Sequence, residues 1–303
     1  MEKNRVLGLI AMTIVTIIYG VSYIAREVVA EYMHSTVIVG IQLIIMTVLF
    51  LLYNLAKKKS MKVSKKDLPM IILSGIFGTC LFHLFTVFSV TEIGANLSSL
   101  LYGFAAVFAL TIDCTVRHRP LTKLSVASII VSLVGVYILM GINFNDLAST
   151  NFKGYALCLA AIICWVVYCF LADKVSDQYE TTVVLTYQAA TGAILLIPFL
   201  FIFPISSAAV FLRFDVLACL FILGVVNSCL AYFLNLYAIK QIGVTISNLL
   251  LNFMPIVTVL VALLLYGVIP TMNQIIGGII VIISVSMLNY DQIAIDKKKE
   301  VSA

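Results

Sequence analysis

The sequence predicts an all-α integral membrane protein with ten transmembrane helices arranged as two inverted five-helix repeats. Of its 303 residues, 62% are hydrophobic and 11% are charged, whereas about a quarter of the residues are charged in soluble domains. Apolar runs of about 20 residues, the length that crosses a bilayer as a helix, recur along the chain. The two halves also match when the sequence is shifted by 149 residues. A soluble enzyme, a nucleic-acid-binding protein and a membrane β-barrel are thereby excluded.

Apolar windows bounded by charged residues or by Pro, Gly and Asn mark the expected spans. The predicted ranges are 6–25, 36–54, 69–91, 94–115, 124–141, 154–172, 182–204, 215–239, 243–266 and 273–290. The first apolar run is longer than the core of a signal peptide and has no small-residue cleavage site. It is therefore expected to be the first span.

The distribution of Lys and Arg predicts the orientation, because basic side chains resist translocation. With both termini inside, the inner segments hold sixteen of the 19 basic residues, and Arg26, Lys153 and Arg213 fall outside. We therefore expect a multi-pass protein of the cytoplasmic membrane with both termini in the cytoplasm. The lysines of the loop from Lys57 to Asp67 are expected to lie against anionic membrane lipid. The net charge of +5 implies no nucleic-acid partner.

An internal duplication predicts the arrangement of the spans. The shift of 149 residues superposes the third to fifth spans on the eighth to tenth, and its matched pairs include Gly75 with Gly224, Cys80 with Cys229, Gly94 with Gly243 and Ser98 with Ser247. A second shift, of 146, places Tyr19 on Trp165. Five spans per copy is an odd number, so the copies must have opposite orientations, with a site near the midplane between them. The predicted units are residues 1–145, residues 146–292 and a cytoplasmic tail, 293–303.

Short motifs stand at defined points along the spans. They are Tyr19-Gly20, Ile93-Gly94-Ala95, Gly135, the segment from Ala161 to Tyr168, Ile242-Gly243-Val244 and the segment from Leu249 to Pro255. In order and spacing they resemble the EamA-type group of the drug/metabolite transporter superfamily, ten-helix exporters made of two five-helix repeats. Family members commonly carry Gly-Glu after the fourth and ninth spans and a proline within the fourth. This chain has instead Arg117-His118-Arg119, Tyr266-Gly267-Val268 and Ala106.

A duplicated polar stripe marks the third and eighth spans. Three residues on one helical face of the third span match three in the eighth under the 149 shift: Thr79, His83 and Thr86 with Ser228, Tyr232 and Asn235. Polar groups inside a membrane either bond between helices or line a wet cavity, and both alternatives stay open. His83 is the one ionisable side chain expected near midplane, which makes it a candidate for substrate binding or proton coupling.

The other candidate binding residues lie on the first, fourth, sixth and ninth spans. They are Tyr19, Ser22, Tyr23, Ser99, Tyr102, Trp165, Tyr168, Asn248 and Asn252. Interfacial aromatic belts and close packing of small residues are the alternative roles for such positions. Tyr19 and Trp165 are the preferred aromatic walls. The resemblance to exporters of aromatic amino acids likewise implies aromatic side chains and a histidine in this part of the third span.

These features predict a secondary transporter, and an exporter, of a small neutral or zwitterionic metabolite such as an amino acid. Lys and Arg are expected to stay at the span ends, which argues against a phosphate carrier. No nucleotide-hydrolysis motif, cofactor, metal site or catalytic residue is expected, so transport is expected to be driven by a gradient and not by ATP. A proton is the candidate coupling ion, and the choice between ion coupling and facilitated diffusion stays open. The alternatives are uptake or exchange of a nucleobase, vitamin or other neutral metabolite, and a non-transporting sensor or scaffold. The oligomeric state is left open.

Overall fold

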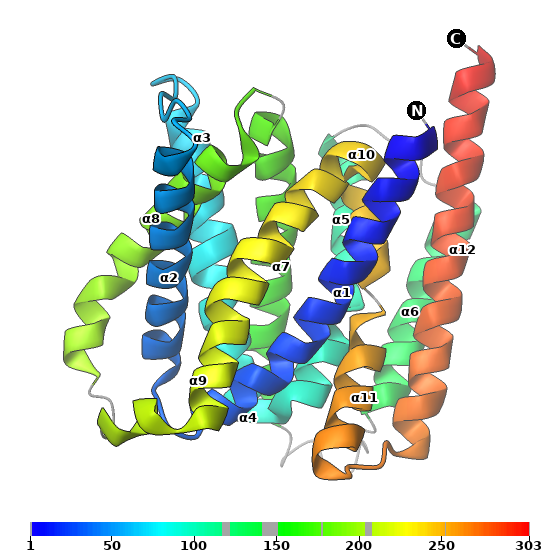
Figure 1. Ribbon diagram of the computed structural model, residues 1–303. Coiled ribbons are helices and arrows are strands. Elements are labelled where there is room, and N and C mark those ends of the chain that lie inside the picture. The colour runs from blue at the N-terminus through cyan, green and yellow to red at the C-terminus, as the bar shows by residue number, and fades with distance from the viewer. Residues whose placement is uncertain are drawn as a thin grey trace.

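The computed structural model describes residues 2–116, 122–140, 151–176, 178–203, 208–251 and 253–302, and this part of the chain is helical, with no strand (Figure 1). Its elements are α1 (Glu2–Ala30), α2 (Ser35–Ala56), α3 (Leu68–Gly75), η1 (Ile76–Leu81), α4 (Phe82–Leu101), α5 (Phe104–Val116), α6 (Lys123–Met140), α7 (Phe152–Ser176), α8 (Thr181–Ile202), η3 (Ala208–Leu212), α9 (Phe214–Phe221), η4 (Ile222–Ala231), α10 (Tyr232–Leu251), α11 (Met254–Tyr266) and α12 (Met272–Ser302).

The helices have the length and composition of membrane spans. Six segments of the described chain are long and apolar enough to cross a bilayer: Asn4–Ala30, Ser35–Ala56, Leu68–Leu101, Phe152–Val175, Thr181–Ile202 and Phe214–Val244. Four shorter apolar helices fall in the remaining predicted spans: Val107–Val116, Lys123–Gly135, Met254–Tyr266 and Met272–Ser284. The predicted all-α membrane fold is confirmed.

Packing between the helices follows the inverted repeat. The second helix of one repeat packs on that of the other, as α2 on α8, and the fifth helices pair in the same way, as α6 on α12. The contact of α1 with α10 has its counterpart in the contact of α7 with α4. In Figure 1, α6 and α12 form one side of the bundle, away from α2 and α8. The interface between the repeats is therefore formed by the α2–α8 and α6–α12 pairs together with α1, α4, α7 and α10.

The third and eighth spans depart from ideal α-helices at matched places. Each contains a π-helical segment in its middle, η1 and η4, and each ends at a kinked glycine. Gly94 has φ 80° and ψ 163°, and Gly243 has φ 79° and ψ 163°. The Glu27 carboxylate accepts the Ala95 N–H at 3.3 Å and so supports the helix that begins after Gly94. The kinks separate the third span from the fourth, and the eighth from the ninth, without a loop.

Two predicted helices are broken, and one is longer than expected. The fourth span is interrupted between Leu101 and Phe104, and the ninth between Leu251 and Met254, so the continuous helices predicted over 94–115 and 243–266 are wrong at these points. At the second break, Pro255 has no N–H with which to continue a preceding helix. The tenth span was predicted to end at 290, but α12 continues to Ser302, through a segment rich in good helix formers.

Replacing Gly243 with alanine is expected to destabilise the protein by about 1–3 kcal/mol, because its backbone angles belong to a region that is nearly exclusive to glycine. An added Cβ would meet no atom within 4 Å, so the cost comes from the backbone alone. Gly278→Ala is the matched control: it lies in α12, also meets nothing within 4 Å and has no positive φ. Thermal melting in detergent should show a lower midpoint only for Gly243→Ala, and equal midpoints would contradict the strain argument.

Both termini and the lysine-rich loop lie at the same end of the bundle, with η3 at the opposite end (Figure 1). Lys59 in that loop donates to Glu180 at 2.9 Å, and the Tyr179 hydroxyl donates to Asp67 at 2.6 Å. The hydrogen bond and charge of Lys59 lower the pKa of the Glu180 carboxyl, which keeps the pair ionised. Lys59 is therefore held against the α7–α8 connection. The lipid contact expected for the loop lysines stays a prediction.

Candidate functional site

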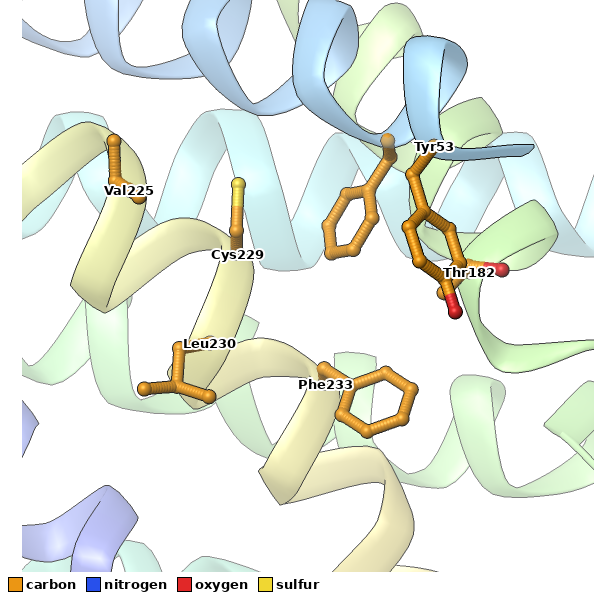
Figure 2. Close-up of a pocket in the computed structure, with 7 residues that line it drawn as sticks. Tyr53, Thr182, Val225, Cys229, Leu230 and Phe233 are labelled. Atoms are coloured by element: carbon orange, nitrogen blue, oxygen red, sulfur yellow. The ribbon is translucent and has the colours of Figure 1, made fainter. Parts of the chain in front are cut away.

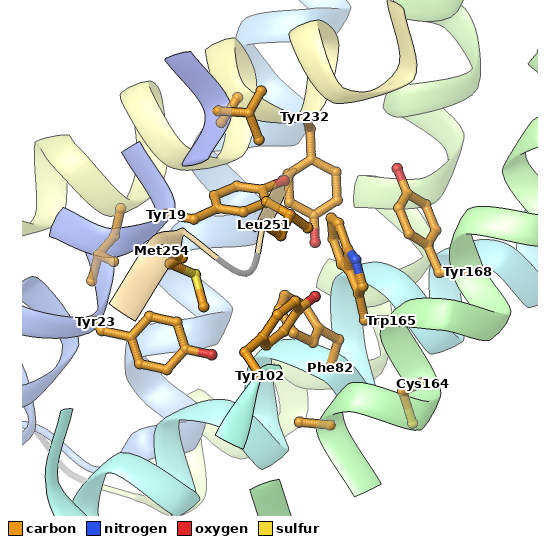
Figure 3. Close-up of a cluster of buried hydrophobic side chains, with 14 of the residues drawn as sticks. Tyr19, Tyr23, Phe82, Tyr102, Cys164, Trp165, Tyr168, Tyr232, Leu251 and Met254 are labelled. Atoms are coloured by element: carbon orange, nitrogen blue, oxygen red, sulfur yellow. The ribbon is translucent and has the colours of Figure 1, made fainter. Parts of the chain in front are cut away.

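Six aromatic side chains meet at the interface between the repeats, and we call them the aromatic cluster: Tyr19, Phe82, Tyr102, Trp165, Tyr168 and Tyr232 (Figure 3). The indole ring of Trp165 lies at the centre, with ring centroids 4.8 Å from Phe82, 5.2 Å from Tyr168 and 5.5 Å from Tyr19. All six side chains are buried. The cluster is therefore closed to solvent on both sides of the bundle in this conformation.

Residues that match between the repeats touch each other at the cluster. Tyr19 and Trp165, matched by the 146 shift, pack edge to face with an interplanar angle of 86°. His83 and Tyr232, matched by the 149 shift, are linked by a contact of 3.1 Å between His83 Nε2 and the Tyr232 hydroxyl. In an inverted repeat, equivalent residues meet only at the symmetry axis. The cluster therefore lies on the pseudo-two-fold axis of the fold.

A chain of hydrogen bonds runs from the first span to the third and eighth. Arg26 Nη2 lies 3.1 Å from His83 Nδ1, and because a guanidinium has no acceptor, Arg26 donates and Nδ1 accepts. The ring is then neutral with its hydrogen on Nε2, which faces the Tyr232 hydroxyl. That hydroxyl donates onward to the Gly78 carbonyl at 2.6 Å. His83 thus links the Arg26 guanidinium, through the Tyr232 hydroxyl, to the π-helical segment η1.

Arg26 is the largest departure from the sequence-based site. Basic residues were expected only at the span ends, with His83 as the one ionisable group near midplane. Arg26 does lie near the end of α1, but its side chain is buried and donates to Ser22 Oγ at 2.6 Å as well as to His83. Tyr23 lies beneath it, with the guanidinium carbon 5.6 Å from the ring centroid. The site therefore contains a permanent positive charge.

The polar stripe bonds mainly between helices. Thr79 donates to the Gln188 carbonyl on α8 at 2.9 Å, and Ser228 accepts from the Gln42 amide on α2 at 2.7 Å. Gln42 Nε2 also lies 3.1 Å from His83 Nε2, and because both nitrogens carry hydrogen in the arrangement described above, the two are in contact without a hydrogen bond. For Thr79 and Ser228, interhelical bonding is thus the alternative that the structure supports.

The remaining candidates have three different outcomes. Some bond within their own helix, one bonds to the aromatic cluster, and one lies outside the described residues. Thr86 and Ser99 donate to carbonyls of their own helix. Asn248 accepts the Trp165 indole N–H at 3.0 Å and so fixes the orientation of the ring. Asn252 lies outside the described residues.

Several buried polar atoms in and near the cluster have no hydrogen-bond partner among the described residues. At the cluster they are the hydroxyls of Tyr19, Tyr102 and Tyr168, together with Nε of Arg26 and Oε1 of Gln42, whose side chains contact His83. Other such atoms in the described chain belong to the side-chain amides of Asn96, Gln188, Asn227 and Asn235. Native interiors rarely leave such atoms unpaired, because each costs about 1–3 kcal/mol. The unpaired atoms at the cluster are typical of a place where a ligand or water completes the hydrogen bonding. No group of three His, Cys, Asp or Glu residues gathers in the described chain as a metal site would require.

The candidate binding residues predicted from the sequence did not include Arg26, Gln42 or Phe82. Arg26 carried a signal, because it follows Tyr19 by seven residues and Ser22 by four and so shares their helical face. Gln42 carried one as well, because it matches Gln188 under the 146 shift. Phe82 gave no signal, since one more apolar residue in an apolar span is not distinctive. Its role in the cluster follows only from packing.

A separate cavity of about 330 Å³ lies between α2, α8, η4 and the start of α10 (Figure 2). It is lined by Phe50, Tyr53, Thr182, Val225, Cys229, Leu230 and Phe233. Tyr53, Leu230 and Phe233 are exposed on the outer surface of the bundle. None of the predicted site residues lines this cavity, so the candidate site is the aromatic cluster.

The family and its relatives agree with this architecture. The model of the EamA-like transporter family matches residues 6–141 and again residues 152–290. A protein of Archaeoglobus fulgidus named as an uncharacterized transporter is 20% identical, over 91% of this chain and 96% of its own length. A protein of Streptantibioticus cattleyicolor named "Probable terminal-alkyne amino-acid exporter" is 24% identical, over 74% of each chain.

One solved crystal structure superposes on 95% of this chain and 96% of its own with a TM-score of 0.69, at 15% sequence identity. At that identity the likeness shows a shared fold. The double family match covers nearly all of the sequence, which confirms the predicted place in the drug/metabolite transporter superfamily. The chain belongs to the EamA-like transporter family.

Proposed function

We propose that the protein is a secondary active transporter that exports a small zwitterionic or neutral metabolite, such as an amino acid, from the cell. The observation that carries the proposal is the closed aromatic cluster on the pseudo-two-fold axis, with unpaired polar atoms around it. Secondary transporters with inverted repeats bind their substrates near midplane at such an interface. The relative named as an amino-acid exporter adds support for the substrate class.

Alternating access follows from the symmetry of the repeats. When two inverted copies exchange their conformations, a site on the axis is exposed first to one side of the membrane and then to the other. The kinks at Gly94 and Gly243 join spans without loops, so each can transmit a tilt of one span to the next. The cluster is then opened by movement of α1, α4, α7 and α10 against one another, and the closed conformation described above is an occluded state.

Flux into reconstituted liposomes tests the proposal. A thermal-shift screen with a metabolite panel first selects ligands, because a ligand that binds only the folded state raises its apparent stability. Selected amino acids are then offered to liposomes with and without an imposed pH gradient. We expect accumulation that depends on the protein and responds to the gradient. If no panel member moves faster than into protein-free liposomes, the transport proposal fails.

The proposed orientation places both termini and the lysine-rich loop in the cytoplasm, and cysteine labelling tests it. Lys62 is exposed in that loop, so a Lys62→Cys variant is expected to react with an impermeant maleimide only in inside-out vesicles or after permeabilisation. The unsubstituted protein, which contains seven cysteines, measures background labelling. Reaction of Lys62→Cys in intact cells would reverse the proposed orientation.

A further inference from the structure

We propose that Arg26 binds the carboxylate of the transported molecule and that the aromatic cluster holds the apolar part of the same molecule. This rests on the proposed transport function and narrows its substrate class to zwitterionic amino acids with an apolar or aromatic side chain. Three observations on Arg26 carry it: a buried charge without a counterion, unused donors, and the absence of a matching cation in the other repeat.

The guanidinium has no counterion among the described residues. Arg26 makes no ion pair there with an Asp or Glu, and the carboxylate of the adjacent Glu27 is engaged by the Ala95 N–H instead. Its partners are Ser22 and His83, both uncharged in this arrangement. A buried charge without a partner of opposite sign is costly, and an ionisable group inside a membrane is by default functional. An anionic ligand supplies the missing charge.

The Arg26 guanidinium and two nearby tyrosines have hydrogen-bond donors that no described residue uses. Nε of Arg26 and the hydroxyls of Tyr19 and Tyr102 have no partner among the described residues. A carboxylate has two oxygens that accept up to about four hydrogen bonds, and a guanidinium binds it with two parallel N–H donors. The donors that the closed site leaves unpaired therefore suit the acceptor capacity of one carboxylate.

The amount of charge favours a carboxylate over a phosphate. Arg26 is the single buried Lys or Arg in the described chain, so one positive charge faces the ligand. A phosphate dianion would leave a net negative charge in the membrane interior, whereas a carboxylate balances it.

The repeat symmetry is broken at this position, which gives the site two different ends. The 146 shift places Arg26 on Ala172, so the second repeat supplies no second cation. Arg26, Ser22 and His83 form a charged and polar end, and the rings of Phe82, Trp165 and Tyr168 form an aromatic one. A ligand with one anionic group and one apolar group matches this polarity in a single orientation.

Ligand pairs that differ only in the carboxylate test the proposal. The full-length protein in nanodiscs is titrated with L-phenylalanine and L-leucine and with the amide of each, and binding is followed by the emission of Trp165, the one tryptophan of the chain. We expect each acid to bind at least tenfold more tightly than its amide. Arg26→Gln should abolish this difference, and Arg26→Lys, which keeps the charge but not the fork of two donors, should retain part of it.

The exposed Arg213 provides the matched control, because Arg213→Gln removes a guanidinium paired with Asp215 at the protein surface and should leave the preference unchanged. Equal binding of acid and amide to the unsubstituted protein overturns the proposal, and that comparison needs no variant to fold. Persistence of the preference in a folded Arg26→Gln variant also overturns it. Equal transport of acid and amide contradicts only the role of Arg26. If neither is bound or transported, both the role of Arg26 and the proposed function for this substrate class fail.

Discussion

His83→Ala is expected to weaken substrate binding roughly ten- to a hundredfold and to reduce transport accordingly. The imidazole accepts a hydrogen bond from Arg26 and faces the Tyr232 hydroxyl, and alanine removes both contacts. Hydrogen bonds to a charged group contribute about 1.5–3 kcal/mol, which corresponds to that range of affinity. The measurement is amino-acid flux into liposomes together with a binding titration. Transport at the parental rate with unchanged affinity would make His83 a packing residue.

His83→Gln separates binding from proton coupling. The amide oxygen of glutamine can accept from Arg26 and its nitrogen can donate to Tyr232, but the side chain does not titrate. The neutral ring seen here can take a proton on Nδ1 only when Arg26 no longer donates to that atom. Retained transport that no longer responds to a pH gradient would identify proton coupling through His83, whereas a retained response would leave it a binding role alone. His34→Gln is the control, because His34 lies at the start of α2, stacked on Phe203.

Trp165→Ala is expected to abolish transport and to destabilise the protein by about 3–5 kcal/mol, the usual cost of truncating a large buried aromatic side chain. Trp165 contacts most of the aromatic cluster, so its loss leaves a cavity on the pseudo-two-fold axis and removes the surface on which the other rings pack. Thermal melting and liposome flux are the two measurements. Parental flux in Trp165→Ala would exclude the cluster as the site.

Two further variants separate the roles of ring and indole N–H. Trp165→Phe keeps an aromatic ring but leaves the side-chain amide oxygen of Asn248 without its donor. The free energy of unfolding should fall by about 1–3 kcal/mol, and part of the transport should remain. Ile163→Ala truncates a large side chain on the same helix that is exposed on the outer surface of the bundle. It should change transport little. A loss in Ile163→Ala equal to that in Trp165→Ala would mean that any truncation in α7 disables the protein.

Five of the six residues of the aromatic cluster were already candidates from the sequence, and the duplication also paired some of them. The shifts of 149 and 146 pair His83 with Tyr232 and Tyr19 with Trp165, and the structure brings the members of each pair into contact. They also paired Thr79 with Ser228, which bond to other helices instead. A repeat shows which positions are equivalent but not which of them lie on the axis, since that depends on how the copies cross.

Hydropathy and the odd number of spans per repeat were enough to determine the membrane fold and its inverted symmetry, because a bilayer forces apolar helices of a minimum length and an odd count forces inversion. The inward orientation of the Arg26 side chain was decided only by the tertiary structure. Its position near the end of a span is equally compatible with a side chain that reaches the aqueous interface. Only the packing of α1 against α4 and α10 turns it inward, where His83, 57 residues away in the chain, accepts its hydrogen bond. Charged residues are rare along the spans because a charge inside a membrane is costly. The residues that stabilise the charge of Arg26 come from other helices, and the sequence alone does not identify them.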